Sequence, residues 1–154
     1  MTKQKNPKAL QWFQRSLGKW TSERRYLFAP KLEPVNMTTH FTVEQGLTNN
    51  QFVIKWKGQT SGIMEVELNG DVLNRSRDYF GEDKHSSAVE MVDNDSIVLR
   101  TEYGGMRVRE EIRLLHGDKV RLRQTIGISV ETGKVNLLGQ YGEFRIFDNA
   151  DERV

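Results

Sequence analysis

Turn-forming residues recur along this chain at a nearly constant spacing. Asn69-Gly70 is the strongest signal among them, because both residues tolerate the positive φ of a tight hairpin turn. A spacing of roughly 8–12 residues between turn signals is typical of a β-sandwich or a β-barrel. The chain is therefore predicted to be a meander of short strands. The remaining turn positions are Gly46, Gly58, Gly81, Asn94, Gly105, Gly117 and, after a slightly longer step, Gly133.

Apolar residues alternate with polar ones between these turns. In segment 51–57, Phe52, Ile54 and Trp56 share one face, and segment 62–68 alternates in the same way. Successive side chains of a strand point to opposite faces, so each strand has one buried face and one solvent-exposed face.

The fold class predicted from these patterns is all-β. Ten antiparallel strands in sequence order would close into an up-and-down β-barrel, which removes the sheet edges and leaves room for an interior cavity. The only helical periodicity covers residues 7–17, between Pro7 and Gly18, and we expect a short helix that plugs one end of the barrel. One domain, 1–154, would hold this helix and a barrel over about 19–147. The expected strands are 19–28, 36–44, 51–57, 61–68, 72–80, 87–93, 96–103, 106–115, 119–129 and 134–147.

Composition excludes several function classes. The 23 basic and 21 acidic residues nearly cancel, so the chain lacks the basic face of a nucleic-acid-binding protein. It contains no cysteine, so any thiol chemistry would need a partner's cysteine. His40, His85 and His116 follow no metal-ligand spacing, and we expect no metal site. No apolar leader or membrane-spanning run is visible, and we expect a cytoplasmic protein, or a stromal one if its host has plastids.

Arg121-Leu122-Arg123 places two guanidiniums on one face of an expected strand. Either Leu122 faces the core and both arginines are solvated, or both arginines point into the barrel. The usual exposure of arginine favours the first arrangement. The residues of this segment do not decide between them.

The loop before this segment determines which side chains accompany the arginines. A three-residue loop at 116–118 would place Glu111 opposite Arg123 and Arg113 opposite Arg121. A two-residue loop would put Glu111 on the other face. We expect the odd-length loop, or an equivalent bulge.

An ordered set of residues resembles a known family. Near the N-terminus stands Trp12-Phe13-x-x-Ser16-Leu17-Gly18-Lys19-Trp20-x-Ser22-x-Arg24, which contains the Gly-x-Trp opening of lipocalin-type barrels. From Leu10 to Ile146 the chain resembles the CpeS/CpcS/CpcU-type phycobiliprotein lyases of cyanobacteria, red algae and cryptophytes. The downstream elements of the resemblance are Thr101-Glu102-Tyr103, Glu110-Glu111, Arg121-x-Arg123 and Glu143-x-Arg145.

The resemblance implies a lipocalin-like, calycin-type barrel that binds a phycobilin and attaches it to a cysteine of a phycobiliprotein subunit as a thioether. The bilin, such as phycocyanobilin or phycoerythrobilin, would be the substrate, with no resident cofactor. The partners would be an apo-phycobiliprotein α or β subunit and either a second copy of the chain or a partner lyase subunit. The implied catalytic residues are Glu111 and Glu143, and the implied ligand-binding residues are Arg121, Arg123, Arg24 and Trp56, to which Tyr141 is added because it shares the parity of Glu143.

The chemistry of a bilin suits these residue types. Arginines at i and i+2 lie about 7 Å apart, a separation that could serve two neighbouring propionates. Glutamates facing the same cavity could bind pyrrole N–H groups or donate a proton during thiolate addition. A non-catalytic carrier of a bilin or a fatty-acid-like ligand would use the same arginine pair, so this alternative stays open.

Overall fold

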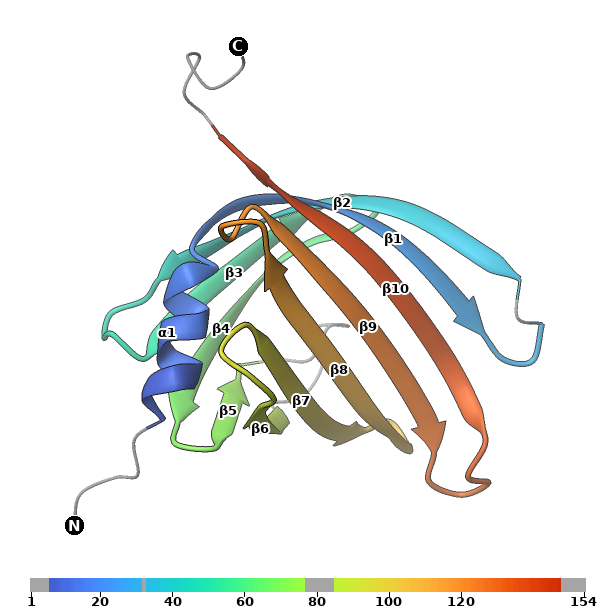
Figure 1. The fold of residues 1–154 in the computed structure, drawn as a ribbon. Coiled ribbons are helices and arrows are strands. Elements are labelled where there is room, and N and C mark those ends of the chain that lie inside the picture. The colour runs from blue at the N-terminus through green and yellow to red at the C-terminus, as the bar shows by residue number, and fades with distance from the viewer. Residues whose placement is uncertain (1–5, 32, 77–84, 148–154) are drawn as a thin grey trace.

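The computed structural model describes residues 6–31, 33–76 and 85–147. These residues form a closed antiparallel barrel with one short helix, so the predicted fold class is confirmed (Figure 1). Each strand pairs with its neighbours in sequence, and the first strand closes the barrel against the last. The elements are α1 (Pro7–Arg15), β1 (Gly18–Phe28), β2 (Pro34–Gln45), β3 (Gln51–Lys57), β4 (Ser61–Asn69), β5 (Val72–Arg75), β6 (His85–Met91), β7 (Ser96–Tyr103), β8 (Met106–Leu115), β9 (Val120–Ser129) and β10 (Val135–Ile146).

Most element bounds lie within two residues of the expected ones, and strand β5 differs by more. Helix α1 ends at Arg15, two residues before the expected end at Leu17, because Ser16 already leaves the helix as its C-cap. Strand β5 ends at Arg75, whereas the expected strand covered 72–80; positions 77–84 lie outside the described residues.

Helix α1 closes one end of the barrel (Figure 1). Its start is fixed by Asn6, whose side chain accepts a hydrogen bond from the backbone N–H of Ala9. On its apolar face, Phe13 stacks on Phe52 of β3 with ring centroids 5.3 Å apart, and Trp12 donates from Nε1 to the carbonyl of Asp95 over 2.8 Å. The amphipathic helix is therefore a plug that covers the packed end of the barrel. Within the described ranges, no helix is both long and apolar enough to cross a bilayer.

The interior changes character along the barrel axis. Beneath α1 the apolar side chains fill the space, with Trp20 of β1 stacked on Phe41 of β2 at 6.4 Å. Toward the opposite end the packing opens into a cavity. The described buried apolar residues at the packed end include Ala9, Trp12, Phe13, Trp20, Phe41, Val43, Phe52, Met64, Val66, Leu68, Leu73, Val89, Ile97, Leu99, Ile112 and Leu114.

Leu122 lies on the outer face of the barrel, 51% exposed, which settles the orientation of its strand. We expect Leu122→Thr to change the free energy of unfolding by less than about 0.5 kcal/mol, because exposed substitutions away from special contacts have small effects. Urea unfolding measures this change. A loss above about 2 kcal/mol would mean that the leucine is packed in the core and that the strand faces the other way.

Candidate functional site

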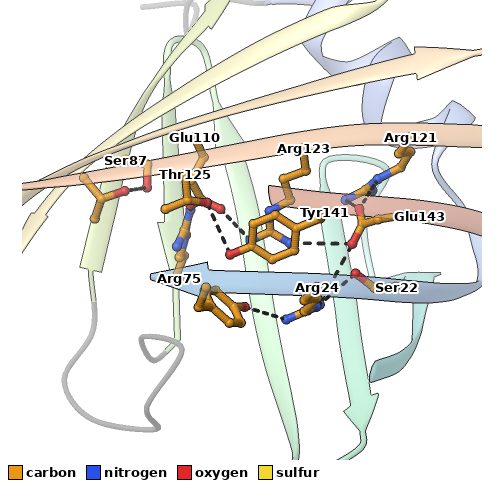
Figure 2. Close-up of polar contacts among 12 residues, drawn as sticks. Ser22, Arg24, Arg75, Ser87, Glu110, Arg121, Arg123, Thr125, Tyr141 and Glu143 are labelled. Carbon is orange, nitrogen blue, oxygen red and sulfur yellow. Dashed lines mark hydrogen bonds and ion pairs between the residues drawn. The ribbon is translucent and has the colours of Figure 1, made fainter. Parts of the chain in front are cut away.

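The site begins with the alternation of side chains along β9. Arg121 and Arg123 point into the barrel and are 5% and 7% exposed, while Leu122 between them points outward. On β10, Glu143 lies directly opposite Arg121 and Tyr141 lies opposite Arg123. Two neighbouring strands therefore bring guanidinium, carboxylate and phenol groups to one region of the interior (Figure 2).

Glu143 is the buried anion at the centre of this group. Its Oε1 accepts hydrogen bonds from Nε of Arg121 at 2.9 Å and lies 2.9 Å from Nη2 of the same guanidinium. Its other oxygen, Oε2, lies 3.9 Å from Nη2 of Arg24 and 4.0 Å from Nη1 of Arg123. The Glu143 carboxylate thus lies within 4.0 Å of three guanidiniums, which come from the neighbouring strands β1 and β9.

These cations determine the ionisation of Glu143. Burial alone would raise the pKa of its carboxyl, but the positive charges of Arg121 and Arg123, with smaller contributions from its other polar neighbours, outweigh burial and lower the pKa below the ordinary 4.5. Glu143 is therefore a carboxylate at neutral pH. It can accept a hydrogen bond, but it has no proton to donate in the resting protein.

The lowered pKa predicts an acid-sensitive fold. A carboxyl whose folded pKa is depressed stabilises the protein above its unfolded pKa, and this contribution is lost as the pH falls from about 4.5 through the folded pKa. We expect Glu143 to contribute up to about 1.4 kcal/mol per pH unit to the fall in unfolding free energy in that range. Urea unfolding of the wild-type protein and Glu143→Gln at several pH values measures the contribution. Parallel pH profiles would show that Glu143 titrates normally.

A second buried carboxylate belongs to Glu110 on β8, which is 1% exposed. Its Oε2 accepts a hydrogen bond from Nη2 of Arg123 at 2.5 Å, and its Oε1 lies 3.4 Å from Nη2 of Arg75 on β5. Glu110 therefore links the arginine of β9 to an arginine from the opposite wall (Figure 2).

The expected placement of Glu111 was wrong. The turn between β8 and β9 covers 116–119, an even number of residues, so Leu115 pairs with Val120 and Ile112, not Glu111, lies opposite Arg123. Glu111 consequently points outward, where its carboxylate lies 3.1 Å from Arg109. A change of one residue in register exchanges the two faces of a strand, so Glu110 takes the interior place expected for its neighbour.

An apolar cavity of about 510 Å³ lies at the open end of the barrel. Its walls are mainly aromatic and aliphatic, and its polar side chains come from Glu110, Arg123 and Thr125 and from the segment 59–61. Such a concave apolar site with a few convergent polar groups is the usual form of a small-molecule pocket. The lining residues are Tyr26, Phe28, Met37, Trp56, Gln59, Thr60, Ser61, Gly62, Tyr103, Val108, Glu110, Arg123, Thr125, Leu137 and Tyr141.

Arg24, Trp56 and Tyr141, which the sequence proposed as ligand contacts, all lie in or beside this cavity. The Arg24 guanidinium donates to the hydroxyl of Ser22 at 2.9 Å and lies 5.1 Å from the centre of the Tyr141 ring. Burial raises the pKa of Tyr141, so its phenol keeps its proton. Their roles toward a ligand stay predictions.

Arg75 and Glu110 are interior residues that the sequence interpretation missed. Arg75 shares a strand face with Leu73, so its parity could have placed it inside the barrel.

Comparison with known proteins identifies the family. The family model for CpeS-like proteins matches residues 61–146. A protein of Nostoc sp. is 30% identical over 89% of this chain and 90% of its own length; it is provisionally named phycocyanobilin lyase CpcS 2. The chain belongs to the CpeS-like family.

One further relative and one solved structure are also similar to this chain. A protein of Picosynechococcus sp., provisionally named chromophore lyase CpcV, is 27% identical over 88% of this chain and 80% of its own length. The structure of the S-type phycobiliprotein lyase CPES from Guillardia theta superimposes with a TM-score of 0.72 at 17% identity, covering 92% of this chain and 94% of the other. At 17% identity, the likeness to the Guillardia theta structure shows a shared fold and no more.

Proposed function

We propose that this protein is a phycobilin lyase, which binds a linear tetrapyrrole in the open-end cavity and attaches it to a cysteine of a phycobiliprotein subunit. The observation that carries the proposal is the combination of CpeS-like family membership with an aromatic cavity whose wall includes Arg123, next to a smaller space that Arg123 shares with Arg24, Arg75 and Arg121. A bilin has a conjugated ring system and two propionates; the cavity offers apolar walls for the ring system, and Arg123 in its wall offers a cation for a propionate.

The charges of the interior support a dianionic ligand. Guanidiniums outnumber carboxylates among the described interior side chains, since Arg24, Arg75, Arg121 and Arg123 accompany Glu110 and Glu143. Arg24 is the most accessible of these cations, with 16% of its side chain exposed. A ligand carboxylate near Arg24 and Arg123 would form charge-assisted hydrogen bonds in a place shielded from water.

The buried glutamates suggest how the bilin would be oriented and activated. Glu110 lines the cavity and suits a hydrogen-bond acceptor for pyrrole N–H groups, whereas fully buried Glu143, held ionised by its arginines, balances their charge behind the cavity wall. In the transfer, the partner's thiolate sulfur would bond to the ethylidene carbon of ring A, and the electron pair released into the π-system would take up a proton. The protein would contribute mainly by orienting and sheltering the bilin.

The acceptor must approach the open end of the barrel, because α1 covers the other end. The partner in the proposal is an apo-phycobiliprotein subunit, which supplies the cysteine that this chain lacks. The corresponding compartment is the cytoplasm of a cyanobacterium or the stroma of an algal plastid.

One reconstitution separates the lyase from a non-catalytic carrier. The purified protein is mixed with phycocyanobilin and an apo-phycobiliprotein subunit, and the products are separated under denaturing conditions. A fluorescent covalent adduct on the subunit, absent without the protein, is the expected result. A shifted bilin spectrum with no adduct on any subunit would favour the carrier, and an unchanged spectrum would overturn bilin binding altogether.

A further inference from the structure

Two aromatic residues of the cavity wall lie flat over glycines. Trp56 of β3 is the cross-strand partner of Gly62 of β4, and a Cβ placed on Gly62 would come within 2.4 Å of Cζ2 of the indole. No side chain fits at that distance, and the atom it would meet belongs to a rigid ring. The indole can therefore remain against the wall only while residue 62 is glycine.

Tyr141 repeats this arrangement on β10, in another part of the cavity wall. A Cβ on Gly139, two residues earlier on β10, would lie 3.0 Å from Cε1 and 3.1 Å from the hydroxyl oxygen of the Tyr141 ring. The ring cannot move away freely, because the Arg123 guanidinium lies 4.5 Å from its centre and the Tyr26 ring packs against its edge at 5.4 Å. An added methyl group would thus displace the phenol or the groups that it contacts.

Backbone conformation does not explain either glycine. Gly62 and Gly139 lie within strands, and neither adopts the positive φ that characterises the turn glycines such as Gly70 and Gly133. Glycine inside a strand is unfavourable relative to alanine by roughly 0.5–1 kcal/mol, and it often marks a close approach. Here the close approach is made by the Trp56 ring to Gly62 and by the Tyr141 ring to Gly139.

We propose that Gly62 and Gly139 determine the width of the cavity and therefore which ligands enter it. Both glycines let a large ring lie along the wall, so that the cavity keeps room for a bulky conjugated guest while its walls stay aromatic. A side chain at either position would push an aromatic ring into the space that the guest occupies. Insofar as the guest is a phycobilin, this inference rests on the proposed function.

The test compares Gly62→Ala and Gly139→Ala with Gly142→Ala. Gly142 is a matched control, because it belongs to the same strand as Gly139 but faces outward, and its Cβ would meet only the Phe144 ring at an ordinary 3.6 Å. Absorbance titrations with phycocyanobilin measure the affinity of each variant. We expect Gly62→Ala and Gly139→Ala to weaken binding about tenfold or more, and Gly142→Ala to bind as the wild type does.

A double-mutant cycle links the effect to the ring. With Trp56→Leu as the background, the methyl group of Gly62→Ala has no indole to displace, so it should cost less than about threefold in affinity. Equal losses with and without the indole would overturn the inference, because the methyl group would then act through the backbone. Equal affinities of all three alanine variants would overturn it as well.

Acrylamide quenching of tryptophan fluorescence tests the inference without any ligand. Trp12 and Trp20 are 1% and 0% exposed, so the accessible signal of the three tryptophans comes from Trp56. Gly62→Ala should raise the quenching constant, since the indole leaves the wall, and an unchanged constant would contradict the inference. If the wild type fails to bind phycocyanobilin, the proposed function fails, while this measurement still decides the effect of the glycine.

Discussion

Glu110→Gln is expected to lower the free energy of unfolding by about 3 kcal/mol and to weaken bilin binding, whereas Glu111→Gln should change stability by less than about 0.5 kcal/mol. Glu110 is buried between Arg123 and Arg75, and removing its charge leaves two guanidiniums without the carboxylate that they share. The neighbouring Glu111 makes only exposed contacts with Arg109 and Arg113, and exposed ion pairs contribute little.

Urea unfolding and phycocyanobilin titration of the two variants measure these effects. Each variant replaces one carboxylate oxygen by an amide NH2 group, and the two positions are adjacent in sequence, so each variant is a control for the other. If Glu111→Gln proved the more damaging change, then β8 would have the register that the sequence interpretation expected, with Glu111 facing Arg123. The experiment thus tests both the site and the strand register.

The barrel could be predicted because strand alternation and turn spacing are local properties. Phe52, Ile54 and Trp56 share one strand face wherever the strand lies in the fold, and each turn glycine marks its turn independently of the others. Pairing neighbouring strands then leaves few topologies other than a closed meander. The resemblance to the CpeS-like family agreed with this result and added the positions of the arginines.

The identity of the interior glutamate could not be predicted, because it depends on the length of one turn. Gly117 marks the turn but not its ends. His116 and Asp118 also adopt positive φ, at 54° and 64°, which non-glycine residues seldom do. The turn is therefore one residue longer than the sequence suggested, and this single residue moves Glu110 inside and Glu111 outside.

The division between core and cavity was also not visible in the sequence. Trp20 and Trp56 both point into the barrel, yet Trp20 is fully buried under α1 and Trp56 is a partly exposed wall of the cavity. The difference depends on how far each residue lies from the helix along the barrel axis. Alternation gives the face of a residue but not its depth, so it cannot tell a core aromatic from a ligand-facing one.

Arg121 and Arg123 of β9 also lie at different depths in the barrel. Their replacement is therefore predicted to affect ligand affinity differently. Arg123 lines the cavity of about 510 Å³ as well as a smaller space of about 70 Å³ beneath it, whereas Arg121 lines only the smaller one. The Arg121 guanidinium lies 5.3 Å from the ring centre of Trp20 and 5.5 Å from that of Trp12, so it packs against the plug and the core. Arg123 is thus the arginine that a ligand in the cavity reaches first.

We therefore expect Arg123→Gln to weaken phycocyanobilin binding about tenfold or more, since a charge-assisted hydrogen bond to a ligand carboxylate contributes about 1.5–3 kcal/mol. Arg121→Gln should weaken binding less, because Arg121 does not line the larger cavity. Both variants should lower the unfolding free energy, since Arg121→Gln breaks the ion pair with Glu143 and Arg123→Gln breaks the ion pair with Glu110. Arg113→Gln, on the outer face of β8, is the control for the loss of one positive charge and should leave both quantities unchanged. Absorbance titration gives the affinities, and urea unfolding gives the stabilities. If Arg121→Gln weakened binding as much as Arg123→Gln, the ligand would have to extend past Arg123 into the smaller space, and the propionates would lie on the two arginines of β9 at different depths.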